Sequence, residues 1–123
     1  MGLTFLKIAV VYLFIGASLG LGMGISQNFA LVPVHAHLLL LGWASLALAG
    51  VVYHLYPGAS TTRLARTHFW LHNLGLPAFM VALALLLMGQ PVPVPVVAVA
   101  AIVVLLGLGL FAVNVFVNAK AAA

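Results

Sequence analysis

Five histidines are the side chains of this 123-residue sequence that are best suited to chemistry: His35, His37, His54, His68 and His72. The sequence contains no Asp, Glu or Cys. It therefore cannot form a carboxylate acid–base pair, a carboxylate-ligated Ca²⁺ or Mg²⁺ site, a Ser-His-Asp triad, an iron–sulfur cluster or a Cys-ligated zinc site. The five histidines are the candidate chemistry that remains, and neutral imidazole is a common metal ligand.

The sharpest motif is His35-Ala36-His37. Residues two apart on a helix with 3.6 residues per turn lie about 200° apart around its axis. The two rings are therefore expected to point to opposite sides of one helix, where they cannot chelate one ion. Each would instead offer a ligand to its own cavity, at nearly the same depth. The alternative is that one or both histidines form hydrogen bonds in helix packing.

His68 and His72 are four residues apart, which places both on one helix face and would allow them to hold a metal. No acidic or thiolate third ligand exists in the sequence, and Arg66 is close by. We therefore favour the interpretation that these two histidines are polar anchors at the membrane interface, alongside Trp70.

His54 lies between aromatic neighbours, with Tyr53 directly before it and Tyr56 two residues after it. Aromatic side chains gather at the level of the lipid headgroups, so we interpret His54 as a residue of this interfacial belt. Together with His68 and His72, it remains a second-tier candidate for metal ligation.

The elements that must position these histidines are membrane helices. Hydrophobic residues make up 67% of the sequence and charged residues 3%, whereas a soluble domain carries about a quarter charged residues. A helix needs about 20 apolar residues to cross the bilayer. We predict an all-α, polytopic membrane protein with one domain over residues 1–123 and four crossings, at about 3–25, 32–56, 68–88 and 94–117.

Prolines and polar residues separate the four apolar runs. Pro33 restarts a helix near its first turn, Pro57-Gly58 forms a turn, and the three prolines between 91 and 95 end the third helix. The first run is long and lacks a convincing small-residue cleavage site, so we expect it to be retained as a span and not removed as a signal peptide.

With four crossings, all four cations would lie on one side of the membrane: Lys7, Arg63, Arg66 and Lys120. The positive-inside rule then places both termini and the loop 56–67 in the cytoplasm, as in an inner-membrane protein. His35 and His37 would lie in the outer part of the second helix, and His54, His68 and His72 near the inner face. Four cations are too few for a nucleic-acid footprint, so the expected surroundings are the lipid bilayer and other subunits.

Small and amide side chains indicate where helices meet. Asn114 and Asn118 are expected to form hydrogen bonds across a helix interface near the cytoplasmic end. Four glycines of the first run form small-xxx-small patterns that favour close helix packing: Gly16, Gly20, Gly22 and Gly24.

Taken in order, the motifs of the second and third runs resemble a known family. They are His35-Ala36-His37, Leu41-Gly42-Trp43, the segment 49–57, the segment 66–71 and Gly75. This order is similar to that of the tenth and eleventh transmembrane helices of the haem-copper oxidase catalytic subunit, most closely its C-type (cbb) branch, over about residues 30 to 90.

In that family the two histidines of the H-x-H motif serve different haems. The first is the proximal ligand of the high-spin haem, and the second is an axial ligand of the low-spin haem. The resemblance implies that His35 and His37 are axial ligands of haem iron, and that haem b (protoporphyrin IX iron) is the cofactor.

The sequence also departs from that family. The catalytic subunit has twelve helices in three arcs of four, whereas this chain is one arc long. It lacks the adjacent His-His pair, a further outer-side histidine for copper, the cross-linked His-Tyr pair, the arginine pair that meets the haem propionates, and the proton-channel carboxylates. We therefore expect no complete oxygen or nitric oxide reductase site in this chain alone.

Two functions from different classes follow. In the first, the chain is a b-type haem protein that forms a homo-oligomer, with a trimer favoured because three arcs restore the three-arc plan. Each interface would then receive His35 from one protomer and His37 from the next, and the low-spin haem would transfer electrons to or from an unidentified partner. In the alternative, the chain is a copper- or metal-handling or oxidase-assembly module without haem. A structural subunit without a cofactor is a third interpretation.

Overall fold

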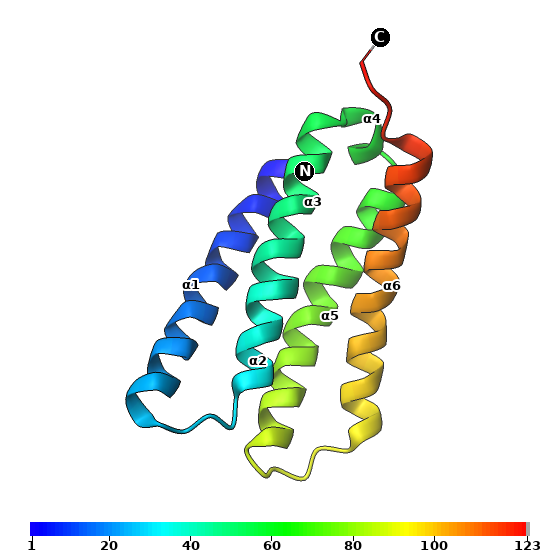
Figure 1. Ribbon diagram of the computed structural model, residues 1–123. Coiled ribbons are helices and arrows are strands. Elements are labelled where there is room, and N and C mark those ends of the chain that lie inside the picture. The colour runs from blue at the N-terminus through cyan, green and yellow to red at the C-terminus, as the bar shows by residue number, and fades with distance from the viewer. Residues whose placement is uncertain (123) are drawn as a thin grey trace.

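A computed structural model describes residues 1–122, which form a bundle of four long helical crossings without a β-strand (Figure 1). Three of the crossings are single α-helices: α1 (Gly2–Ser26), α5 (Arg63–Leu87) and α6 (Val94–Asn118). The fourth runs from Val32 to Leu55, and all four are long and apolar enough to cross a membrane. The prediction of an all-α chain with four membrane helices is therefore confirmed.

The second crossing changes its helical form along its length. It begins as α2 (Val32–His37), continues as the π-helix η1 (Leu38–Ala44), and ends as α3 (Ser45–Leu55). We call these three segments together the composite helix. Pro33 lies in its first turn, where a missing N–H costs nothing. A π-helix uses hydrogen bonds from residue i to i−5 and therefore holds more residues per turn.

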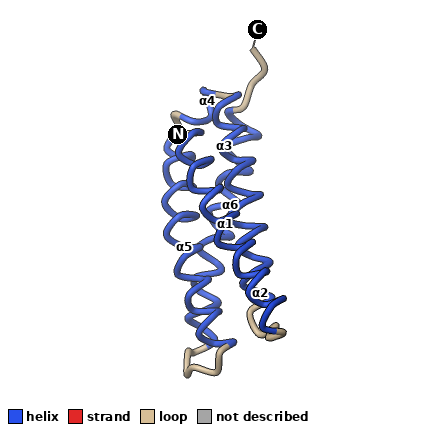
Figure 2. The backbone as a smooth tube through the Cα atoms, turned by 90° about the vertical axis from the view of Figure 1, so that its left-hand side faces the viewer, coloured by secondary structure: helices blue, strands red, loops and turns tan. Residues whose placement is uncertain are grey.

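The crossings alternate in direction and pack as two hairpins. α1 packs along η1 and α3, and α5 packs along α6. The hairpins meet where α2 and η1 contact α5, and where the short helix α4 (Pro57–Ser60) contacts α6. Figures 1 and 2 show both chain ends and α4 at one end of the bundle, and the two longer loops at the other end. We call these the terminal end and the loop end.

Two clusters of buried side chains hold the hairpins together. The cluster nearer the loop end contains Val34, Leu38, Leu76, Phe79, Met80, Ala82, Val97 and Val104. The cluster nearer the terminal end contains Phe5, Ala9, Leu46, Ala49, Tyr53, Ala59 and Ala65. Many large apolar side chains lie outside both clusters, for example Phe116, which is 91% exposed. Such an apolar outer surface suits a hydrocarbon solvent.

The bounds of the crossings agree with prediction to within one residue, except at the start of the third. There α5 begins at Arg63 and not near residue 68. The cause is a local cap: the Thr62 hydroxyl oxygen accepts a hydrogen bond from the Ala65 N–H at 3.0 Å. Much of the expected loop 56–67 is therefore helical, because a capped first turn tolerates the polar residues that ended the apolar run.

All four cations lie in the half of the bundle that contains the terminal end: Lys7 in α1, Arg63 and Arg66 in α5, and Lys120 after α6. His35 and His37 lie near the loop end, in α2. The charges and the His-x-His motif are therefore at opposite ends of the molecule.

Candidate functional site

The His35 ring lies against α1. Its Nδ1 is 2.8 Å from the carbonyl oxygen of Gly16. The ring packs over Gly20, where a Cβ atom would lie 2.6 Å from His35 Cε1. The predicted close packing of the glycine-rich helix is therefore confirmed at Gly16 and Gly20, whereas Gly22 and Gly24 have no neighbour within 4 Å of such an atom.

The His37 ring lies on a different side of the same helix. Its Nδ1 is 2.6 Å from the carbonyl oxygen of Pro33, one turn earlier. The ring meets Phe79 of α5 edge-to-face, with centroids 5.1 Å apart and an interplanar angle of 86°. His35 therefore faces α1 and His37 faces α5, as their spacing of two residues predicts.

The two rings have the same pattern of used and free nitrogens. A carbonyl oxygen only accepts hydrogen bonds, so Nδ1 of both His35 and His37 must carry the proton. In the neutral ring, Nε2 then has a lone pair, and within residues 1–122 no hydrogen bond uses it. Both side chains are partly exposed, and neither Nε2 is sealed from the surface. Metal-ligating histidines commonly hold their second nitrogen in this way.

A second group of polar side chains is sealed inside the bundle. The Tyr53 hydroxyl of α3 is 2.9 Å from Nδ1 of His68, and Nε2 of His68 is 3.1 Å from Nδ1 of His72. Nε2 of His72 is 2.8 Å from the carbonyl oxygen of Leu41. We call this series of three hydrogen bonds the Tyr-His-His chain.

The carbonyl at one end fixes the direction of every hydrogen bond in the Tyr-His-His chain. His72 must donate Nε2–H to Leu41 O, so Nδ1 of His72 accepts the N–H of His68 Nε2. Nδ1 of His68 is then the acceptor for the Tyr53 hydroxyl. All four ring nitrogens are used, and the neutral pair has no lone pair left for a metal.

The interpretation of His68 and His72 as interfacial anchors is wrong, because both side chains are 0% exposed. His68 stacks against Phe5 of α1, with ring centroids 5.2 Å apart. His72 lies deeper than expected, since it reaches Leu41, only one turn beyond His37. Trp70, between them in sequence, is 57% exposed and fits the expected aromatic belt. The spacing of His68 and His72 predicts that they share one face of α5, but it does not predict that this face is buried.

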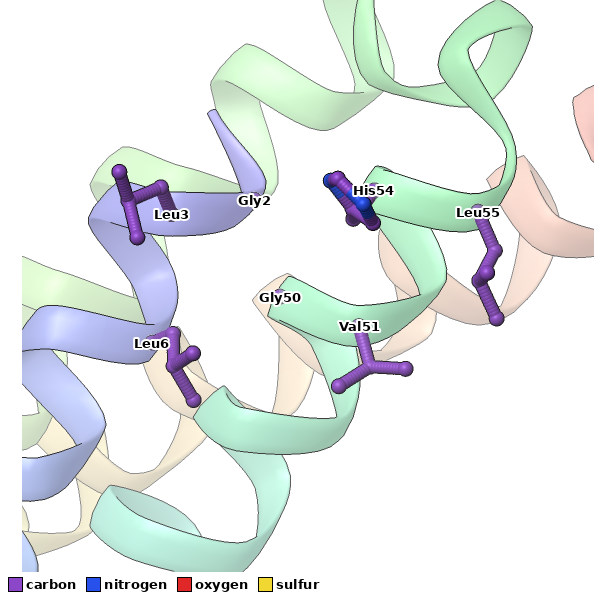
Figure 3. A pocket seen from close by; sticks show the side chains of 7 residues that line it. All are labelled: Gly2, Leu3, Leu6, Gly50, Val51, His54 and Leu55. Carbon is purple, nitrogen blue, oxygen red and sulfur yellow. The ribbon is translucent and has the colours of Figure 1, made fainter.

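His54 lies apart from the other histidines, at the terminal end. It is exposed and lines an apolar groove of about 450 Å³ between the start of α1 and the end of α3 (Figure 3). The other lining residues are Gly2, Leu3, Leu6, Gly50, Val51 and Leu55. The exposed side chain at a helix end fits the predicted interfacial position.

The predicted hydrogen bond across a helix interface is confirmed for Asn114 but not for Asn118, whose amide donates to Asn114 within α6. Asn114 is fully buried and donates to the carbonyl oxygen of Ala59 at 2.9 Å. Its own side-chain oxygen accepts from the hydroxyl of Thr62 at 3.1 Å and from the amide of Asn118 at 2.8 Å. The contacts with Ala59 and Thr62 join α6 to α4 and to the cap of α5.

The fold and these polar groups define the class of the molecule: a four-helix, polytopic membrane protein with two histidines that each offer a free ring nitrogen. Comparison with family models, with curated proteins and with solved structures finds no match to this chain.

Proposed function

We propose that this chain is a membrane protein that binds b-type haem through His35 and His37 and transfers electrons through it. One observation carries the proposal: both rings donate Nδ1–H to a backbone carbonyl and leave Nε2 free. That arrangement fixes the ring tautomer and direction and raises the basicity of the remaining nitrogen, as iron ligation requires. The resemblance of residues 30–90 to haem-copper oxidases points to the same two residues.

Held by His35 of one protomer and His37 of another, haem would supply a one-electron redox centre. His35 and His37 of one chain cannot be the two ligands of one iron, because their rings face α1 and α5 respectively. The second residue that would hold each haem would therefore come from another protomer. A head-to-tail interface forms a ring where its rotation closes, and we propose that this one closes as a trimer.

The chain offers no cation for the haem propionates, because all four cations lie toward the terminal end. The polar side chains at and after the end of α1 form hydrogen bonds with neighbouring backbone groups. Gln27 donates to the Gly24 carbonyl at 2.6 Å, and the side-chain oxygen of Asn28 accepts from the Ala30 amide at 3.1 Å. The residues beside the loop end would therefore leave the propionates of a bound haem to be solvated by water.

The decisive experiment is an optical spectrum of the purified protein after expression with ample haem. We expect a Soret band, reduced α and β bands typical of bis-histidine haem b, and protoporphyrin IX iron in the pyridine haemochrome assay. His35→Ala and His37→Ala should each lower the haem content strongly, because axial ligation is lost. His54→Ala is the matched control, since His54 is exposed and far from both rings.

A protein without a Soret band, or a haem that is unchanged in both alanine variants, would contradict the proposal. Elemental analysis of the same samples separates the metal-handling alternative, because free imidazole Nε2 atoms also suit copper. Stoichiometric copper without porphyrin would favour that function. The mass of the detergent-solubilised protein tests the trimer.

A further inference from the structure

We infer that His72 is a positioning residue: through the Leu41 carbonyl it holds the π-helical segment that sets the directions of the His35 and His37 rings. The expected effect of His72 on haem binding rests on the proposed function. The inference that His72 stabilises the π-helical segment does not. The inference starts from the Tyr-His-His chain, which is buried, fully hydrogen-bonded and not part of the ligand pair.

The first step is the backbone of η1. In an α-helix the Ser45 N–H would donate to the Leu41 carbonyl, four residues earlier. Here it donates to Leu40, and the Ser45 hydroxyl donates to the same oxygen at 2.8 Å. The Leu41 carbonyl therefore lacks its α-helical amide donor, and the His72 Nε2–H occupies it from α5 at 2.8 Å.

A buried carbonyl without a donor is unfavourable, particularly inside a membrane where no water replaces the lost partner. The donor from His72 therefore stabilises the π-helical form relative to a regular α-helix. Tyr53 and His68 keep that donor in place, because they leave Nδ1 of His72 as an acceptor and so keep its proton on Nε2.

The second step links η1 to the ligand pair. One residue corresponds to about 100° of rotation around a helix axis. Loss of the π-helical register by one residue would therefore turn α2, with His35 and His37, by about that angle relative to α3. The rings would then no longer face Gly20 of α1 and Phe79 of α5, as they do here.

Besides the hydrogen bond between Tyr53 and His68, α5 contacts the composite helix at two places closer to the ligand pair. His72 holds Leu41, and Phe79, two turns further along α5, packs edge-to-face on the His37 ring. The Tyr-His-His chain does not conduct protons across the bundle, because its last acceptor is a carbonyl that cannot pass a proton on. Its geometry suits holding one helix against another.

The first test uses the whole chain without haem, in bilayers, with ¹⁵N in histidine and ¹³C in the leucine carbonyls. Solid-state NMR should give the Nε2–H tautomer for both His68 and His72, and a hydrogen-bond contact between one leucine carbonyl and His72 Nε2. An Nδ1–H tautomer of His72, or absence of the carbonyl contact, would overturn the inference even if haem binds.

The second test compares His72→Leu, which removes the donor, with His72→Gln, which can keep an N–H for Leu41. Loss of a group that orients a ligand typically weakens metal binding about 10–100-fold. We expect His72→Leu to weaken haem binding about tenfold and to shift the haem spectrum and reduction potential, and His72→Gln to restore them. His54→Leu is the control for histidine loss elsewhere.

Failure of the proposed function and failure of the inference about His72 give different results. A wild-type protein that binds no haem removes the proposed function, while the tautomers and the carbonyl contact still decide the structural inference. A folded His72→Leu protein with an unchanged haem spectrum and potential would overturn the positioning role of His72.

Discussion

At the residue scale, four histidines form two pairs that differ in how many ring nitrogens take part in hydrogen bonds. His35 and His37 each donate one N–H to a carbonyl and keep a lone pair free. His68 and His72 donate and accept at every ring nitrogen. Each buried ring has two hydrogen-bond partners and each ring of the motif has one, so the capacity to bind a metal depends on hydrogen bonding and not on residue type alone.

Tyr53→Phe tests the buried histidines at this scale. The change removes only the hydroxyl that donates to His68 Nδ1 and leaves a buried acceptor without a donor. Such a loss costs about 1–3 kcal/mol. We expect the free energy of unfolding, measured by circular dichroism in mixed detergent, to fall by that amount.

Tyr56→Phe is the matched control for the loss of a hydroxyl. Tyr56 is only half-buried, and within the described part of the chain its hydroxyl forms no hydrogen bond. We expect its effect to be close to zero. Equal losses in both variants would show that the Tyr53 hydroxyl contributes nothing specific to the bundle.

At the element scale, α1 is shaped to receive the composite helix. A Cβ atom at Gly16 would lie 2.8 Å from Leu39 Cδ2, and one at Gly20 would lie 2.6 Å from His35 Cε1. α1 therefore presents glycines where the side chains of Leu39 in η1 and His35 in α2 pack against it. This close fit lets the His35 ring reach the Gly16 carbonyl.

Gly20→Ala should displace the His35 ring and break its hydrogen bond to Gly16, because the added methyl group overlaps the ring. Overpacking of this kind typically costs about 1–3 kcal/mol. We expect lower stability in detergent and a lower haem content. Gly22→Ala is the control, since no atom lies within 4 Å of the added group. A normal haem content in Gly20→Ala would argue against a ligand role for His35.

At the scale of the whole molecule, charge divides the bundle into two ends. The cations lie toward the terminal end, and the His-x-His motif lies near the loop end. By the positive-inside rule we propose that the terminal end lies in the cytoplasm of a cell with an inner membrane. His35 and His37 would accordingly lie toward the outer side.

Fusions to the C-terminus test this orientation. A fluorescent protein that folds only in the cytoplasm should be bright, and a phosphatase that is active only outside should be inactive. The combined change Arg63→Gln and Arg66→Gln should weaken the preference, because it removes half of the four cations. An active phosphatase fused to the unmodified chain would reverse the assignment of both ends.

The sequence by itself determined the features that depend on neighbours along the chain. Apolar runs and prolines placed the four crossings, because the length of a spanning helix and the missing N–H of proline are local constraints. Helical geometry also separated the rings of His35 and His37, since two residues of spacing suffice to define their relative direction.

Only the tertiary structure decided the states of the other histidines and the form of the second crossing. The spacing of His68 and His72 gives a shared face, but side chains from α1, α3 and α6 that contact His68 bury that face. The segment Leu38–Ala44 carries no local signal for a π-helix. Its form depends on a donor from His72, 31 residues away, and such partners are chosen only when the helices pack together.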